Sequence, residues 1–222
     1  MQVEWYGHSA FALRAGGKTV FIDPFGDVSG LAARGMQFEY PPIAGVSADL
    51  VLVTHEHLDH NGVEAIAGDP AILRPTAGRL DSPFGEVLAI ASEHDAAAGT
   101  QRGPNTIFAL ALDGVRVVHL GDFGQRAMRD EQAEAIGNPD LLLLPVGGWP
   151  TIGDEQAAQI AQRLAPRWIV PMHYRTPRID FLETADAFLE RMPHVLRVDG
   201  SAFETADLPA AGGPLVVVPA AP

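Results

Sequence analysis

The chain has 222 residues, of which 47% are hydrophobic, so it can form a sizeable core and is not a disordered protein. Its net charge of −13, from 15 basic and 28 acidic residues, disfavours binding to nucleic-acid backbones and anionic membranes. It contains no cysteine, which excludes disulfides, thiolate metal sites and a cysteine nucleophile.

The first half of the chain is predicted to consist mainly of strands. Apolar residues on both sides of Gly16-Gly17 predict a hairpin within residues 10–23. Residues 26–48 carry several glycines and prolines and predict a long surface loop. The apolar run "DLVLV" predicts a strand that is buried on both faces. The further expected elements are that strand at 49–53, a short helix at 62–68, and strands at 71–75 and 85–92.

The second half also begins with a hairpin and then alternates between strands and helices. Asp113-Gly114 lies between two β-rich runs in residues 105–122, which is typical of a type I′ turn. Asp154 is the expected N-cap of the second helix, and Gly137 the C-cap of the first. The expected helices span 126–137, 151–166 and 180–192, and the strands 140–146, 167–172 and 195–199.

The element order indicates one α/β domain over residues 1–222, in which two packed sheets carry helices on the outside. Residues 201–222 are rich in Ala, Gly and Pro, and we expect an irregular tail there. The N-terminus lacks a basic and apolar leader, and no run approaches the roughly 18 apolar residues of a membrane span. We therefore expect a cytoplasmic protein; its oligomeric state is left open, a homo-oligomer included.

Potential metal ligands follow four of the predicted strands. The motif "THEHLDH" comes directly after strand 49–53, and the sites of open α/β sheets form at the carboxyl ends of strands. Imidazole and carboxylate are suitable ligands for zinc, iron and manganese. Side chains two positions apart in an extended segment face the same side, so the first two histidines can reach one metal. The candidate ligands are His55, His57, Asp59, His60, His94, Asp122 and His173.

The motif "THEHLDH" resembles the His-x-His-x-Asp-His signature of the metallo-β-lactamase superfamily, and "LGD" and "PMHY" follow in the expected order. "WYGHSAF", "FIDPF" and "PVGG" resemble one branch, the ascorbate-6-phosphate-lactonase-like, UPF0173-type metal-dependent hydrolases. The resemblance covers residues 3–200 and implies an αββα sandwich of two mixed sheets. It also implies a binuclear metal centre that hydrolyses a small-molecule substrate.

By this resemblance, the first metal is held by His55, His57 and His94, the second by Asp59, His60 and His173, and Asp122 bridges the two. Diiron oxygen reductases of the superfamily typically have glutamate at the position of His57. The histidine favours a hydrolytic pair of divalent ions, zinc before manganese, over a redox iron site.

The expected reaction is attack by a metal-bridging hydroxide on a small ester, lactone or phosphoester, an anionic one included. Asp59 would orient the hydroxide and take up its proton, and His8 would donate to the leaving group or the developing oxyanion. A structural role is the alternative for His8. The alternative functions are a phosphodiesterase or nuclease, a redox diiron protein, and a non-catalytic binding protein.

Several other polar and aromatic residues have expected roles near this site. Asp23 is expected to orient a ligand histidine or the loop that carries it. Asp95 is an alternative ligand to His94, and Trp149 either walls the cleft or belongs to the core. Of the two remaining histidines, His119 is expected to be buried beside the ligands in a supporting role, and His194 is expected to lie in a surface loop. Either Arg102 or Arg175 could pair with an anionic substrate group, and the alternative for both is an ordinary exposed surface arginine.

Overall fold

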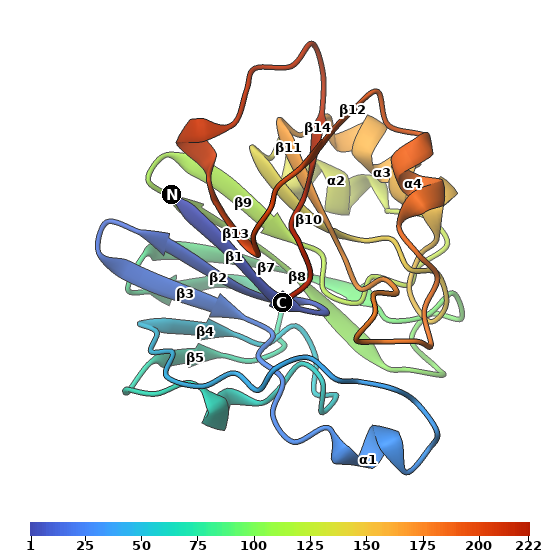
Figure 1. Ribbon diagram of the computed structural model, residues 1–222. Coiled ribbons are helices and arrows are strands. Elements are labelled where there is room, and N and C mark those ends of the chain that lie inside the picture. The colour runs from blue at the N-terminus through green and yellow to red at the C-terminus, as the bar shows by residue number, and fades with distance from the viewer.

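The computed structural model describes residues 1–222 as two facing β-sheets with a few short helices (Figure 1). Strands β1 to β3 are antiparallel, whereas β3, β4 and β5 are parallel, so the six-stranded sheet is mixed. The hairpin expected around Gly16-Gly17 is formed by β2 and β3. In spatial order this sheet contains β13 (Ala202–Glu204), β1 (Gln2–Gly7), β2 (Ala10–Ala15), β3 (Lys18–Ile22), β4 (Leu50–Leu52) and β5 (Ala71–Leu73).

The second sheet has eight strands and is also mixed. Strands β6 to β9 are antiparallel, and the remaining strands run parallel to β9. Asp113 and Gly114 join β8 to β9 with φ of 49° and 76°, as a type I′ turn requires. In spatial order the sheet contains β12 (His194–Arg197), β14 (Leu215–Val218), β11 (Trp168–Met172), β10 (Leu141–Pro145), β9 (Val115–His119), β8 (Pro104–Leu112), β7 (Gly85–Glu93) and β6 (Gly78–Ser82).

The main hydrophobic core lies between the sheets and continues under three helices. Alternate side chains of β1 and β2, such as Trp5 and Phe11, point into it, as the two-residue period of a strand dictates. Strands β10 and β11 are buried along their whole length, because helices cover their other face (Figure 1). These helices are α2 (Asp130–Ile136), α3 (Asp154–Leu164) and α4 (Asp186–Glu190).

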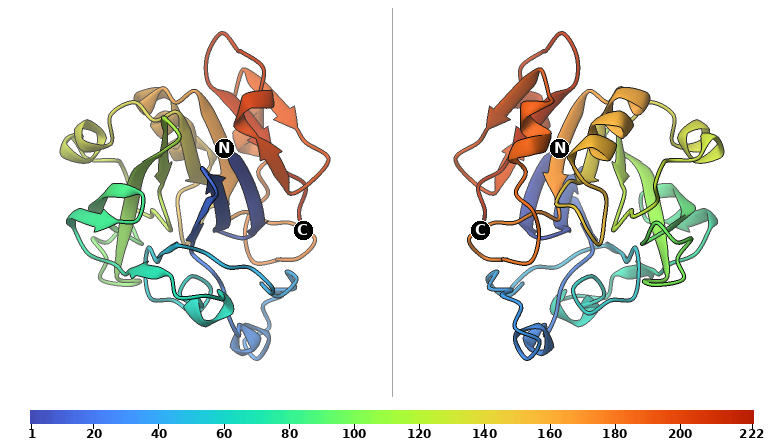
Figure 2. Two further views of the ribbon diagram at one scale, coloured as in Figure 1. Left: turned by 90° about the vertical axis from the view of Figure 1, so that its left-hand side faces the viewer. Right: turned by 90° about the vertical axis from the view of Figure 1, so that its right-hand side faces the viewer.

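A loop, and not a layer of helices, covers the outer face of the six-stranded sheet. Phe21 and Val51 of this face belong to a second core together with Tyr40 and Ile43 of the loop 26–48. The only helix in this loop, α1 (Ser29–Ala32), buries no residue and projects from one end of the sandwich (Figure 2). The αββα expectation is confirmed for the two sheets, but the helical layer is well formed only on the eight-stranded side.

The expectation of an irregular tail over residues 201–222 is wrong. Strand β13 pairs with β1, and β14 is inserted between β11 and β12 in the eight-stranded sheet. The sequence of β14 is "LVVV", and all four residues are buried. These four residues form a strand because β11 and β12 offer them hydrogen bonds on both sides. The surrounding Ala, Gly and Pro residues make this strand hard to recognise in the sequence.

The helices are shorter than expected. Helix α2 begins at Asp130 because the backbone of Arg129 is extended. The backbone N–H of Arg129 donates to the side chain of Gln132 in a capping box. Asp154 is the first helical residue of α3, after Gly153 as N-cap, where its charge still favours the helix N-terminus. Residues 62–68 form only the 3₁₀ turn η1 (Val63–Ala65), and a second turn, η2 (Thr205–Asp207), follows β13. None of the helices has the length and hydropathy required to cross a bilayer.

Candidate metal centre

The carboxyl ends of six strands from both sheets meet at one edge of the sandwich. Each strand is followed within a few residues by a histidine or an aspartate that points toward the same place. The residues delivered are His8 after β1, Asp23 after β3, residues 55–60 after β4, His94 after β7, Asp122 after β9 and His173 after β11.

The carboxylate of Asp122 lies at the centre of this cluster. Its Oδ2 is 3.0 Å from Nε2 of His94 and 3.1 Å from Nε2 of His173. The same oxygen is 3.8 Å from Nε2 of His55, and Oδ1 is 3.3 Å from Nε2 of His60. One buried carboxylate thus faces four imidazoles, as the bridging role that the resemblance implies for Asp122 would require.

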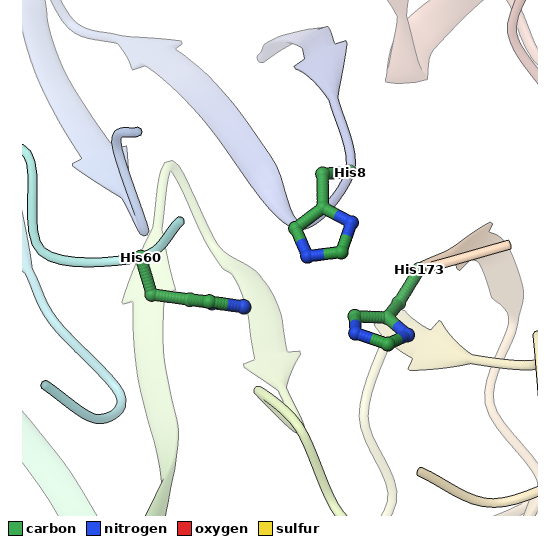
Figure 3. Close-up of side chains that lie close together, drawn as sticks. All are labelled: His8, His60 and His173. Carbon is green, nitrogen blue, oxygen red and sulfur yellow. The ribbon is translucent and has the colours of Figure 1, made fainter. Parts of the chain in front are cut away.

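Two sets of three histidines surround Asp122, and a third set, His55, His60 and Asp122, joins them; within each set the potential ligand atoms lie within 4.8 Å of one another. We call His55, His57 and His94 the outer group, because His57 is only half-buried. We call His8, His60 and His173 the inner group, because all three are buried and their rings converge from three separate segments (Figure 3). The outer group has the composition expected for the first metal.

The inner group contains a histidine that the resemblance did not assign as a ligand. The ring centroids of His8 and His173 are 4.3 Å apart. Nε2 of His8 lies 3.2 Å from Oδ2 of Asp59, without hydrogen-bond geometry, and this oxygen is 3.9 Å from Nε2 of His60. The structure therefore brings both predicted catalytic residues, Asp59 and His8, to the ligands expected for the second metal.

Backbone strain is concentrated at this edge. His8 and His173 both have a φ of 52°, in the left-handed region that non-glycine residues rarely adopt. The strained pair is tied together, because the backbone N–H of His173 donates to the carbonyl of His8 at 3.2 Å. A Cβ at Gly147 would lie 2.1 Å from the carbonyl oxygen of His173, so only glycine allows this approach.

Asp23 holds His60, which is one of the two roles expected for this aspartate. Its Oδ2 accepts a hydrogen bond from Nδ1 of His60 at 2.9 Å and another from Oγ1 of Thr54 at 2.7 Å. Its Oδ1 accepts the backbone N–H of Thr54 at 2.8 Å. These contacts fix the imidazole with Nε2 toward the centre, the role that a carboxylate behind a metal-binding histidine performs.

Asn105 supports the Asp122 loop and was not identified in the sequence. Its Oδ1 accepts the backbone N–H of Asp122 at 3.0 Å, and its Nδ2 donates to the carbonyl of Leu120 at 2.8 Å. A Cβ at Gly121 would lie 2.3 Å from Oδ1 of Asn105, so the close approach of the two segments requires glycine here. The only signal in the sequence is a polar residue at the start of an otherwise buried strand.

His119 is buried beside the cluster, as expected, but outside both groups. Its Nδ1 accepts the backbone N–H of Gly121 at 3.0 Å, and its Nε2 lies 3.0 Å from the carbonyl oxygen of Ser9. Because both nitrogens are hydrogen-bonded to backbone atoms, His119 joins the loop that carries His8 to the loop that carries Asp122. This is a structural use of both ring nitrogens.

The other candidate residues lie away from the ligand atoms. Asp95 is not an alternative ligand, because its carboxylate accepts four backbone N–H groups of its own loop. Trp149 is 75% exposed, which excludes the core alternative. His194 is exposed as expected, although it begins strand β12 and is not in a loop. Arg175 is also exposed.

The cluster strongly shifts the pKa values of its members. Burial by itself raises the pKa of Asp122, but the neighbouring His173 and His60 outweigh burial and hold this pKa well below its usual range. Burial by itself lowers the pKa of His60, but Asp122 and Asp23 raise it well above its usual range. Burial, with the nearby His173, lowers the pKa of His8 to about 4.

The cluster fits a metal because several of its buried atoms have no hydrogen-bond partner. These atoms include Nε2 of His55, Nε2 of His60 and Oδ1 of Asp122, all at the centre. Leaving buried polar atoms unpaired is costly, and native proteins rarely do so without an ion, a water or a functional reason. An all-nitrogen and oxygen set of this kind is suited to zinc and manganese.

The two mixed sheets and the histidine–aspartate cluster at their common edge define a metallo-β-lactamase fold protein. The model of the β-lactamase superfamily domain matches residues 2–173. The UPF0173 metal-dependent hydrolase of Thermococcus kodakarensis is 32% identical over 204 residues, covering 79% of this chain and 85% of the relative. The UPF0173 metal-dependent hydrolase of Thermus thermophilus is 30% identical over 221 residues, covering 86% and 91%.

A solved structure from Thermotoga maritima, of a candidate zinc-dependent hydrolase of the metallo-β-lactamase superfamily, superimposes with a TM-score of 0.78. It is 31% identical, and the match covers 98% of this chain and 97% of that protein. The chain belongs to the metallo-β-lactamase superfamily and, within it, to the UPF0173 metal-dependent hydrolases.

Proposed function

We propose that this metal-dependent hydrolase uses two divalent ions that share Asp122. The observation that carries the proposal is the position of this carboxylate, whose oxygens lie 3.0–3.8 Å from Nε2 atoms of both histidine groups. Two ligand sets that share one carboxylate are the composition of a two-metal site.

The outer group, His55, His57 and His94, would hold the first ion. His60 and His173 would hold the second together with Asp59, whose side chain is 21% exposed and borders both the cluster and solvent. The two histidine groups support a number of two ions. The Thermotoga maritima relative is described as zinc-dependent, and this supports zinc as the preferred ion. Manganese is the second choice, because the ligand chemistry suits both ions.

The residues around the ions divide the remaining work. When bound, a pair of divalent ions lowers the pKa of a shared water to about 7 and so supplies a hydroxide at neutral pH. Asp59, at the boundary between cluster and solvent, orients the attacking oxygen and accepts its proton. His8 lies 3.2 Å from Oδ2 of Asp59 and is held neutral by burial, so it can donate an N–H to the leaving group or to the developing oxyanion.

The substrate class we propose is a small molecule with an ester, lactone or phosphoester bond. The acidic surface supports a small substrate over a long nucleic acid, because a net charge of −13 repels a polyanion. A panel of lactones, esters and phosphodiesters, run with zinc and with manganese in parallel, identifies the bond. Turnover of bis-p-nitrophenyl phosphate alone would instead favour a phosphodiesterase.

The test of the two-ion proposal is metal analysis combined with one substitution. The purified, reloaded protein should contain close to two ions per chain. His57→Ala should lower the ion content and abolish hydrolysis while leaving the folded circular dichroism spectrum intact, because His57 is half-buried at the cluster edge. His194→Ala removes an exposed histidine outside the cluster and is the matched control. A chain that remains metal-free after incubation with zinc and manganese would overturn the proposal.

A further inference from the structure

A small pocket opens beside the outer histidine group. Its volume is about 240 Å³, and its position next to two candidate ligands places any occupant within reach of the reacting centre. This volume is below the roughly 300–1,000 Å³ of sites for drug-sized ligands, so the occupant is a short group. The lining residues are His55, Glu56, His57, Pro75, Arg102 and Pro104.

Arg102 carries the uncompensated positive charge of this pocket. No carboxylate oxygen lies within 4.0 Å of its guanidinium, although the chain has 28 acidic residues. Glu56, on the same pocket wall, is already paired with Arg74 at 2.7 Å. The five guanidinium N–H donors of Arg102 therefore remain available to a ligand.

Two contacts hold Arg102 in place beside the pocket. Its backbone N–H donates to Oδ2 of Asp95 at 2.7 Å, so the carboxylate that organises the loop also fixes the Cα of Arg102. Its guanidinium lies over the ring of Trp149, 4.9 Å from the centroid. A cation–π contact of this kind restricts the long side chain without using its hydrogen-bond donors.

We propose that Arg102 binds an oxyanion, a carboxylate or a phosphate, that the substrate carries away from its scissile bond; this rests on the proposed hydrolytic function. A guanidinium pairs with either oxyanion through two parallel N–H···O bonds. The substrate is then a short molecule with the reacting group at the metal ligands and a negative charge at Arg102. Trp149 is a positioning residue in this assignment, and Arg175 lies outside this pocket.

The kinetic test compares two esters of equal acyl length, mono-p-nitrophenyl glutarate, which has a free carboxylate, and p-nitrophenyl valerate, which has none. Wild-type protein loaded with zinc should prefer the glutarate ester. Arg102→Ala should lower the ratio of kcat/KM for the charged ester to that for the neutral ester by roughly 10- to 100-fold, the usual loss for a hydrogen bond to a charged group. Arg102→Lys should recover only part of the ratio, because lysine cannot form the paired bonds.

The matched control is Arg175→Ala, which removes an exposed arginine that does not line the pocket and should leave the ratio and both rates unchanged. Trp149→Ala should lower the ratio less than Arg102→Ala does, and mainly through KM, because the guanidinium loses its support but remains present. Unfolding curves identical to that of the wild type establish that each variant is folded. An unchanged ratio in a folded Arg102→Ala would overturn the proposal.

A binding measurement separates this proposal from the hydrolytic one. Glutarate, butyrate and 4-phosphonobutyrate are titrated calorimetrically into zinc-loaded wild type and Arg102→Ala. Arg102→Ala should weaken the binding of glutarate or of 4-phosphonobutyrate, which each carry a second anionic group, more than the binding of butyrate. The acid whose binding is weakened more identifies the oxyanion as a carboxylate or a phosphate. Equal losses for all three acids would overturn the role of Arg102. Absence of ester turnover by the wild type would count only against the hydrolytic proposal.

Discussion

The inner and outer histidine groups share the carboxylate of Asp122 but differ in what surrounds them. The inner group is sealed: His60 is clamped by Asp23, and His8 and His173 are joined through a backbone hydrogen bond. The outer group opens to solvent at His57 and to the pocket of Arg102. We propose that the substrate approaches from the side of the outer group, while His60 and His173 of the inner group provide the fixed geometry.

Asp122→Ala should have the largest effect, because it removes the feature that both groups share. Both ions should be lost or bound far more weakly. The value of kcat/KM should fall by more than the roughly 10- to 100-fold that is typical when a residue that only hydrogen-bonds to a metal ligand is removed. Metal content and steady-state rates measure this directly. Retention of two ions by the variant would contradict the idea of a shared ligand.

The inner group should also produce a pH-dependent stability in the metal-free protein. Burial lowers the pKa of His8 to about 4 from its ordinary value of 6.5, so between these values the unfolded chain binds a proton that the folded chain does not. Stability from this residue is complete above pH 6.5 and decreases as the pH falls toward 4, by about 3 kcal/mol in total.

Urea unfolding in the presence of a chelator, at pH steps from 7 to 4, measures this decrease. His8→Gln removes this titrating group at similar size and should make the curve less steep over the same pH interval, where His55 and His57, whose pKa values burial also lowers, still contribute. Parallel curves for the wild type and the variant would show that His8 does not contribute.

Asp23→Asn tests whether the inner group depends on its clamp. The amide keeps one oxygen for the backbone N–H of Thr54 but replaces the oxygen that accepts from His60 with a donor. We expect metal affinity or activity to fall by roughly 10- to 100-fold. Competition with a chromophoric chelator should locate the loss in one of the two ions, and equal weakening of both would argue against separate groups.

Glu56→Gln should have the smallest effect, and it tests the solvent-exposed side of the outer group. Glu56 pairs with Arg74 at the surface, where both side chains are about half exposed, so the pair contributes at most about 1 kcal/mol to stability. Thermal unfolding and metal content should both remain near the wild-type values. A loss of metal in this variant would mean that the outer group is less tolerant than its exposure suggests.

The sequence predicted most of the candidate site because metal ligands follow strands whose ends must meet. His55 and His173 follow strands that are buried along their whole length, and such strands are readable from apolar runs. His94 and Asp122 follow partly buried strands that are flanked by turn residues. Asn105 and the place of His8 within the inner group could not be predicted in this way. Both depend on which loops from distant parts of the chain touch, and no local pattern records that.

The same limit applies to the strands. Residues 201–222 were expected to be irregular, yet β14 lies within the eight-stranded sheet between two strands. Four apolar residues give too short a run to identify a strand among Ala, Gly and Pro. These residues form a strand because β11 and β12 leave backbone hydrogen-bonding groups unpaired between them, and β14 pairs with both. Its apolar side chains are buried there.

The sequence by itself determined the class of fold, the absence of thiolate ligands and the set of histidines and aspartates available to a metal, because composition and strand-end spacing are local properties. Only the tertiary structure decided that these residues divide into a sealed inner group and an open outer group. It also selected Arg102, and not Arg175, as the cation beside the outer group. Burial and charge pairing are set by neighbours that are remote in sequence, and packing alone brings them together.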